Sequence, residues 1–259
     1  LSPKPNLGYV AFGLWLGSIA MFIAAGIVFD KPRPLSWFRR LKSLSQKARR
    51  SVYLEISIVT VLTAIALILR VCELDVFPTS VHGDEGEIGM VALQFLGIGD
   101  PISPMGFSWS SSPNLSFLLR ALFIAIFGRN EYGLRVMPAL FGTACIPLIY
   151  LIGKKFWGKA AGFTAAWLMT VSHFFIQYSR ICIGCIEPVV FMLLFIFLLV
   201  DTETHKTTNE NFKDSEKDSD ESGGKATLAP YIWMGIIGGL APYLYIGSRL
   251  IPIIALPVI

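Results

Sequence analysis

The chain has 259 residues, of which 54% are hydrophobic and 15% are charged, and its formal net charge is +4. A mean hydropathy of +0.61 excludes an ordinary water-soluble domain. The apolar runs are long and continuous rather than alternating, which predicts an all-α polytopic membrane protein, because backbone polar groups must be paired inside the bilayer.

The first 50 residues predict a transmembrane anchor followed by a basic loop. Residues 8–29 carry no charge and are long enough to cross about 30 Å of hydrocarbon. The stretch 31–50 then holds eight Lys and Arg residues. Basic loops remain on the cytoplasmic side, so we expect 1–50 to be an N-terminal anchor with a cytoplasmic loop.

The next apolar run, 52–69, predicts a second span that leads into an acidic loop. Residues 71–119 contain six acidic residues and no Lys or Arg. The contrast with 31–50 predicts that the first outer loop, 71–133, faces the outside. Within it, 114–127 is apolar but would reach only about 21 Å as a helix. We expect it to lie along the outer interface or to re-enter the membrane.

If 114–127 does not cross the membrane, Lys154, Lys155 and Lys159 fall on the cytoplasmic side, as the charge rule prefers. The same placement determines the direction in which each later span crosses. Further spans are predicted at 134–153, 160–178, 186–200 and 231–248. The polar stretch 201–230 has too few large apolar residues to form a core, which predicts a disordered cytoplasmic loop. Residues 51–259 are thus expected to form one transmembrane module. The chain starts without Met and stops inside an apolar run, which predicts a C-terminally incomplete piece of a longer protein.

The octapeptide 81–88, VHGDEGEI, is the densest acid cluster of the chain. One interpretation is structural: Asp84 would cap an amphipathic helix, with Glu87 three residues later completing a capping box. The other is catalytic, because a carboxylate near the membrane boundary is suited to act as a general base. His82 either assists Asp84 or is an ordinary surface residue. The pair Cys182 and Cys185 is either structural or a redox pair.

Several stretches, taken in order, resemble a known family. After the octapeptide come FGRNEYGLRVMPALFGTACIPLIYLIGKKFWG (127–158), YSRICIGCIEP (178–188) and GGLAPYLYIGSRLIP (238–252). Their order resembles the GT-C superfamily of membrane glycosyltransferases. The similarity is greatest to glycosyltransferase family 39, which includes protein O-mannosyltransferases and lipid A aminoarabinose transferases. The resemblance covers about residues 52–259.

The resemblance implies a GT-C-like helix bundle that transfers a sugar from a polyprenyl-phosphate donor to an acceptor hydroxyl at the outer face. Asp84 would be the general base or acceptor-orienting acid, and Glu85 the second acid of the pair. The residues that would bind the substrate or its phosphate are His82, Arg180, Arg249, Tyr243 and Tyr245.

Two features of the resemblance concern ions. Some superfamily members bind a divalent metal through acids of the second outer loop, which makes Glu187 a candidate ligand for Mg²⁺ or Mn²⁺. The alternative is a helix-starting acid before a proline. The aminoarabinose branch has a basic residue late in the first outer loop, whereas 110–115 reads SSSPNL. Phosphate binding would then fall to Arg249, Arg180, Arg120 or residues further along.

The expected partners are a polyprenyl-phosphate sugar lipid, an acceptor that is a protein, lipid or glycan, and the membrane, but not nucleic acid. The expected location is a bacterial or archaeal plasma membrane, with the active site outside. The alternative is a multi-pass transporter or lipid flippase, which would place ionisable groups near the bilayer midplane. Most acids instead lie in loops, with Glu55 as an exception. A purely structural anchor is the third interpretation.

Overall fold

The computed structural model describes residues 5–29, 46–215, 229–245 and 248. All regular structure in these ranges is helical, apart from an isolated bridge between Phe107 and Pro113. The elements are α1 Pro5–Phe29, α3 Gln46–Val71, α4 Gly83–Phe95, the 3₁₀ turn η1 Trp109–Ser111, α5 Asn114–Phe127, α6 Glu131–Trp157, α7 Lys159–Val171, α8 His173–Ser179, α9 Glu187–Ser215 and α10 Ala229–Leu244. The predicted all-α class is confirmed.

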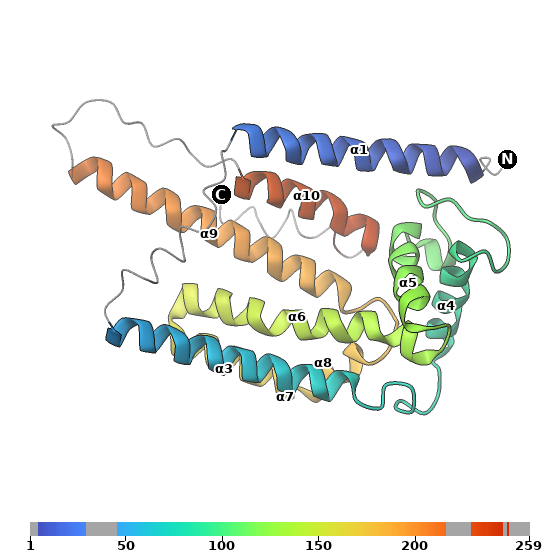
Figure 1. The fold of residues 1–259 in the computed structure, drawn as a ribbon, viewed down its shortest axis with the longest axis horizontal. Helices are drawn as coiled ribbons and strands as arrows, with labels where there is room; N and C mark the ends of the chain where they lie inside the picture. Colours follow the sequence, from blue (N-terminus) through green and yellow to red (C-terminus); the bar gives the residue numbers. More distant parts are fainter. Residues whose placement is uncertain (1–4, 30–45, 216–228, 246–247, 249–259) are drawn as a thin grey trace.

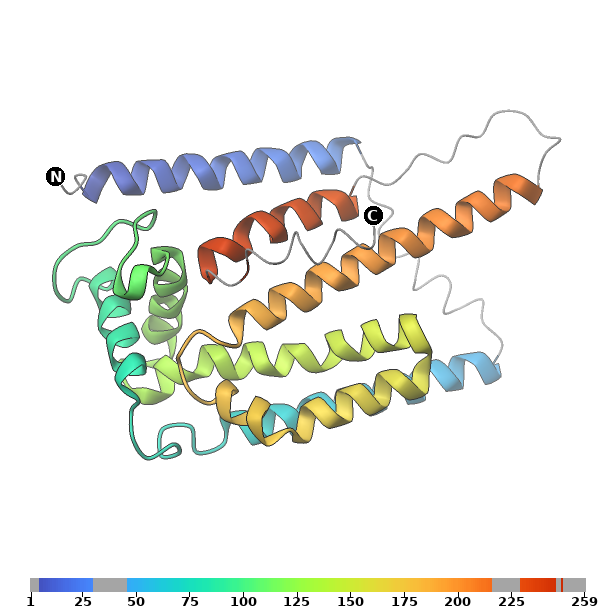
Figure 2. The ribbon, with the colours of Figure 1, turned by 180° about the vertical axis from the view of Figure 1, so that it is seen from behind.

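The long helices lie side by side along one direction, and α4 and α5 lie across one end of them (Figures 1 and 2). We call α4, α5 and the loops that join them the end layer. α6 is central and packs against α3, α5, α7 and α9. Its contact with α7 is close because both helices have a glycine there: a Cβ on Gly153 would lie 2.9 Å from the Cα of Gly162.

Among the residues that the structure describes, two helices are long and apolar enough to cross a membrane, namely Arg50–Val71 within α3 and the whole of α6. They differ in burial: 11% of the most apolar stretch of α3 is buried inside the protein, against 61% of the most apolar stretch of α6. α3 exposes large apolar side chains such as Leu54, Val61 and Ile68. A water-soluble protein rarely leaves such a continuous apolar face open, so α3 has the surface of a lipid-facing helix.

The end opposite the end layer carries paired lysines. Lys154 and Lys159 both form ion pairs with Glu55 of α3, the latter with an Nζ–Oε2 distance of 2.8 Å. Lys155 pairs with Asp201 in the same way. Glu55 therefore lies at the lysine-bearing end of α3 rather than midway along it. The start of α4, which carries the octapeptide, and the end of α6, which carries Lys154 and Lys155, lie at opposite ends of the bundle (Figure 1).

Two expectations about element boundaries differ from the structure. The span expected over 160–178 is broken at Ser172, whose Oγ accepts a hydrogen bond of 3.4 Å from the Phe175 amide and so starts α8 as a separate helix. α9 continues to Ser215, into the stretch 201–230 for which composition predicts disorder. Residues 216–228 of that stretch and 30–45 of the basic loop lie outside the described residues.

Candidate active site

The octapeptide forms the start of α4, and its capping box uses different residues from those expected. The N-cap is His82, whose Nδ1 accepts a hydrogen bond of 3.3 Å from the Asp84 amide. Glu85 completes the box, because its Oε2 accepts a hydrogen bond of 3.4 Å from the His82 amide. The interpretation of Asp84 and Glu87 as the capping pair is therefore wrong, and neither acid is needed to start the helix.

Glu85 is completely buried and joins three parts of the chain. Its carboxylate accepts from Arg135 of α6 through Nε at 2.8 Å and Nη2 at 3.0 Å. The same carboxylate accepts from the Cys182 amide at 3.1 Å. Both oxygens are thus engaged by protein donors, and two parallel charge-assisted bonds give the contact a fixed geometry. Glu85 holds α4 against α6 and the 180–186 loop.

Arg135 extends this contact to the segment that follows α3. Its Nη1 donates to the carbonyls of Leu74 at 3.1 Å and Pro78 at 2.9 Å. Its Nη2 also lies 3.4 Å from the Ser80 carbonyl. One buried guanidinium therefore fixes the path of residues 74–80 as well as the first turn of α4.

Asp84, by contrast, is exposed, and its partner among the described residues is His82, whose Nδ1 lies 3.9 Å from Asp84 Oδ2. More than half of each side chain is open, with 63% of His82 and 53% of Asp84 accessible. The backbone of Asp84 is held by the cap and by its neighbour Glu85. Its carboxylate is thus free to accept a proton or a hydrogen bond from a molecule in front of α4.

Arg180, expected to bind phosphate, is occupied by backbone carbonyls. Its guanidinium donates to Leu69 at 2.9 Å, to Cys72 at 2.8 Å, to Glu73 at 3.1 Å and to Phe77 at 2.9 Å. The side chain is buried, and burial lowers the pKa of Arg180. These hydrogen bonds join the end of α3 and the residues after it to the 180–186 loop. The N–H groups that form them are therefore not available to a lipid phosphate.

Arg120 of α5 and Glu187 at the start of α9 form a second buried ion pair. Arg120 also donates through Nη1 to the Ser116 carbonyl at 3.1 Å and through Nε to Cys182 Sγ at 3.2 Å. α5 is therefore connected to the bundle through a buried charge. The buried Oε2 of Glu187 has no hydrogen-bond partner among the described atoms.

This environment does not fit a divalent metal at Glu187. A guanidinium already neutralises the carboxylate and would repel a second cation at close range. Within the described residues, no three His, Cys, Asp or Glu side chains gather in a way that could hold a metal ion. The alternative reading of Glu187, a helix-starting acid, agrees with its place in the first turn of α9.

The tyrosines expected at the site point to different places. Tyr243 lies near the end of α10 and packs against Trp15 of α1, with ring centroids 5.9 Å apart. The ring of Tyr245 lies 3.7 Å from the position that a Cβ on Gly184 would take, beside the Arg120 side chain. Arg249 lies outside the described residues. The structure thus brings Tyr245, but not Tyr243, close to the buried Arg120.

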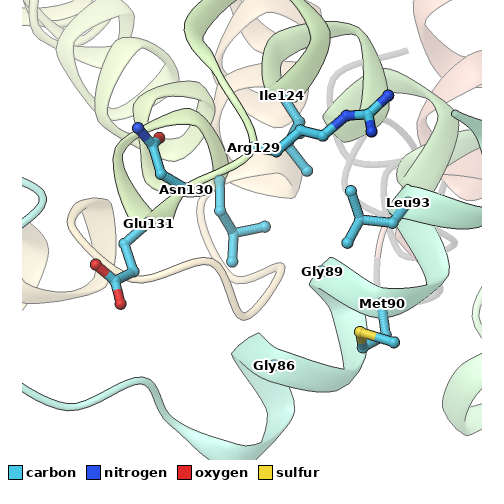
Figure 3. A pocket seen from close by; sticks show the side chains of 9 residues that line it. Gly86, Gly89, Met90, Leu93, Ile124, Arg129, Asn130 and Glu131 are labelled. Atoms are coloured by element: carbon cyan, nitrogen blue, oxygen red, sulfur yellow. The ribbon is translucent and has the colours of Figure 1, made fainter. Parts of the chain in front are cut away.

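A cavity of about 350 Å³ opens in the end layer, between α4 and the turn from α5 to α6 (Figure 3). α4 contributes Gly86, Gly89, Met90 and Leu93, and the turn contributes residues 129–131. Asp84 is not among the residues that line it. Sequence reasoning missed this cavity and the role of Arg135, although an arginine inside an apolar helix was a usable signal, because such residues are paired or functional.

The chain is similar to known glycosyltransferases over part of its length. Residues 111–211 match the family model of dolichyl-phosphate-mannose-protein mannosyltransferases. An undecaprenyl phosphate-alpha-4-amino-4-deoxy-L-arabinose arabinosyl transferase of Pseudomonas savastanoi pv. phaseolicola is 30% identical over 105 residues, which cover 38% of this chain and 20% of that protein. Arabinosyl transferase 2 of Pseudomonas fluorescens is 31% identical over 101 residues, covering 37% and 17%.

Solved structures share the fold. The apo oligosaccharyltransferase of Archaeoglobus fulgidus has a TM-score of 0.53 at 17% identity, covering 77% of this chain and 24% of that one. The same organism's AglB with an inhibitory peptide and a dolichol-phosphate has a TM-score of 0.54 at 17% identity, covering 78% and 25%.

The chain therefore spans about a fifth of the curated relatives it matches and about a quarter of the structural neighbours. The family match begins after the octapeptide, so it covers Arg120, Arg135 and Glu187 but not Asp84. In agreement with the motif order of the sequence, the chain is similar to glycosyltransferases of family 39 over part of its length and shares the fold of a GT-C oligosaccharyltransferase.

Proposed function

We propose that the protein transfers a sugar from a polyprenyl-phosphate donor to an acceptor hydroxyl, at the membrane face where the end layer lies. The relatives that match are named as transferases that use undecaprenyl phosphate sugars, and one structural neighbour was solved with a dolichol-phosphate. The apolar faces of the helices would hold the polyprenyl tail, so that the headgroup reaches the end layer.

The outer face is favoured by the charge at the opposite end of the bundle. That end carries Lys154, Lys155 and Lys159, and basic residues remain on the cytoplasmic side. The octapeptide at the other end would then face outward, where no nucleotide sugar is available. A lipid-linked donor is the chemistry that such a location requires.

The observation that carries the proposal is that Asp84 and Glu85 are adjacent in sequence but lie in different environments. Glu85 is buried and fixed by Arg135, while the adjacent Asp84 is exposed on a helix turn that Glu85 holds in place. A catalytic base needs both a free carboxylate and a fixed position. Glu85 would then position the site rather than contact the substrate.

In the proposed reaction, the acceptor hydroxyl oxygen forms a bond to the anomeric carbon of the sugar. The bond from that carbon to the phosphate oxygen breaks, and the phosphate leaves with the electron pair. Asp84 accepts or orients the hydroxyl proton, and a single displacement inverts the anomeric configuration. Stabilising the departing phosphate requires a cation, for which Arg249 remains the prediction because Arg120 and Arg180 are engaged elsewhere.

The test is Asp84→Asn in the purified full-length protein, assayed separately with polyprenyl-phosphate mannose and with polyprenyl-phosphate aminoarabinose. Loss of a general base lowers turnover by about 10²–10⁴-fold. Glu87→Gln is the matched control, because Glu87 is an exposed acid of the same helix that makes no ion pair within the described structure. Wild-type protein that turns over neither donor would overturn the transferase proposal. An active wild type whose Asp84→Asn variant matches Glu87→Gln would overturn only the role of Asp84.

A further inference from the structure

The cavity between α4 and the α5–α6 turn is separate from the face that carries Asp84. Its α4 residues are Gly86, Gly89, Met90 and Leu93, a spacing that places them on one side of the helix. Asp84 precedes Gly86 by two residues and so lies about 200° around the helix axis. A ligand in this cavity would therefore not lie in front of Asp84.

The cavity has an apolar floor and two opposite charges at its rim. Ile124 of α5 and Leu134 of α6 join Met90 and Leu93 to form the floor. Figure 3 shows the guanidinium of Arg129 on the side of Leu93, and the carboxylate of Glu131 directed to the other side of the cavity.

Both rim side chains are exposed and neither forms an ion pair within the described part of the chain. The turn that carries them is joined to α6, because the Oδ1 of Asn130 between them accepts a 2.8 Å hydrogen bond from the Gly133 amide.

The position of the cavity suits a membrane lipid. Glu131 and Leu134 belong to the first turn of α6, one of the two helices able to cross a membrane. The cavity thus opens at the level where the apolar part of a span begins. Met90 of the cavity lining and Ile126 near the end of α5 are 60% and 75% exposed. A volume of about 350 Å³ is within the range of small-ligand pockets and takes a headgroup with the first carbons of its chains.

We propose that this cavity binds a phospholipid whose headgroup carries a phosphate and a primary ammonium, as in phosphatidylethanolamine. Arg129 pairs with the phosphate, Glu131 accepts from the ammonium, and the acyl chains cover Met90 and Leu93. A zwitterionic headgroup offers an opposite charge to each of the two rim side chains, whereas a purely anionic lipid would leave Glu131 unpaired and close to the negative charge of the lipid.

The test measures lipid binding to the delipidated full-length protein by native mass spectrometry, with phosphatidylethanolamine, phosphatidylcholine and phosphatidylglycerol as probes. We expect one site that binds phosphatidylethanolamine about three- to tenfold more tightly than the other two, since the quaternary ammonium of phosphatidylcholine has no N–H to donate. Arg129→Gln should weaken its binding by about three- to tenfold, and Glu131→Gln should remove the preference among headgroups.

Three further variants distinguish binding in this cavity from non-specific binding of lipid to the protein surface. Gly86→Leu should block the cavity without changing charge, and the helix tolerates the residue because a Cβ there meets only Val81 at 3.9 Å. Glu87→Gln and Arg50→Gln lie outside the cavity and should bind like the wild type. Binding that ignores the headgroup, or that falls equally in these two controls, would overturn the proposal. No sugar donor enters the assay, so its failure leaves the proposed transferase activity untouched.

Discussion

The ion pair between Glu85 and Arg135 gives the sharpest stability prediction, because the accessible fractions of the two side chains are 0% and 1%. Water does not screen such a pair, and removing one partner leaves the other buried without a counter-charge. Losses of this kind cost about 3–5 kcal/mol. Glu85→Gln keeps the shape of the side chain, removes its charge and turns one acceptor oxygen into an NH2 group that faces N–H donors, so it breaks the ion pair without opening a cavity.

The two single variants should differ in size. Glu85→Gln leaves Arg135 its three carbonyl acceptors in the segment 74–80, so we expect a loss near the lower value, about 3 kcal/mol. Arg135→Met leaves the Glu85 carboxylate buried without a counter-charge and also removes the hydrogen-bond donors to those three carbonyls. We therefore expect a loss of about 5 kcal/mol in the free energy of unfolding. The double variant Glu85→Met with Arg135→Met buries no charge and should be less destabilised than Arg135→Met alone.

The assay is thermal unfolding of the purified variants in one detergent, followed by intrinsic fluorescence. For a protein of this size about 1 kcal/mol corresponds to 2–4 °C. Glu85→Gln should then melt about 6–12 °C below the wild type and Arg135→Met about 10–20 °C below. Glu87→Gln, on the exposed side of α4, should have the same melting temperature as the wild type. A Glu85→Gln variant as stable as Glu87→Gln would refute the reasoning.

Two more predictions follow from close contacts and from burial. A Cβ on Gly142 of α6 would lie 2.2 Å from Ser179 Oγ, so Gly142→Ala should destabilise the protein by about 1–3 kcal/mol, whereas Gly239→Ala, with no atom within 4 Å of its Cβ, should not. Equal melting temperatures for the two alanine variants would contradict the close packing of α6 on the α8 end. Burial raises the pKa of the Cys182 thiol to about 11, so native protein should react with maleimide at the exposed Cys72 and not at Cys182. Because only the thiolate reacts, labelling of Cys182 should rise as the pH approaches 11, and rapid labelling near pH 7 would show that the 180–186 loop is open.

The all-helical class and the positions of the main helices could be predicted from composition because they depend on local signals. Long apolar runs predict the helices, and the contrast in charge between 31–50 and 71–119 predicts opposite sides of the membrane for these two segments. Segment 114–127 was expected to lie flat or re-enter because it is too short to cross, and α5 lies across the ends of the long helices (Figure 1). These features depend on residues close together in the sequence.

The partners of the buried charges could not be predicted, because each pair joins distant segments. Arg135 and Glu85 are 50 residues apart, and Arg120 and Glu187 are 67 apart. Hydropathy shows that an arginine within an apolar helix needs a partner, but not which carboxylate supplies it. For the same reason Arg180 could be taken as a phosphate ligand, although its donors bind carbonyls more than 100 residues away.

The two adjacent acids differ in their partners and in their exposure. Glu85 lies on the buried face of α4, three and seven residues before Ile88 and Ala92, and its carboxylate is paired with Arg135. Asp84 lies one residue closer to the start of α4, where 53% of its side chain is accessible. An Asp-Glu dipeptide at the start of a packed helix thus supplies one anchored carboxylate and one free carboxylate at a fixed distance from it, the combination that a positioned general base requires.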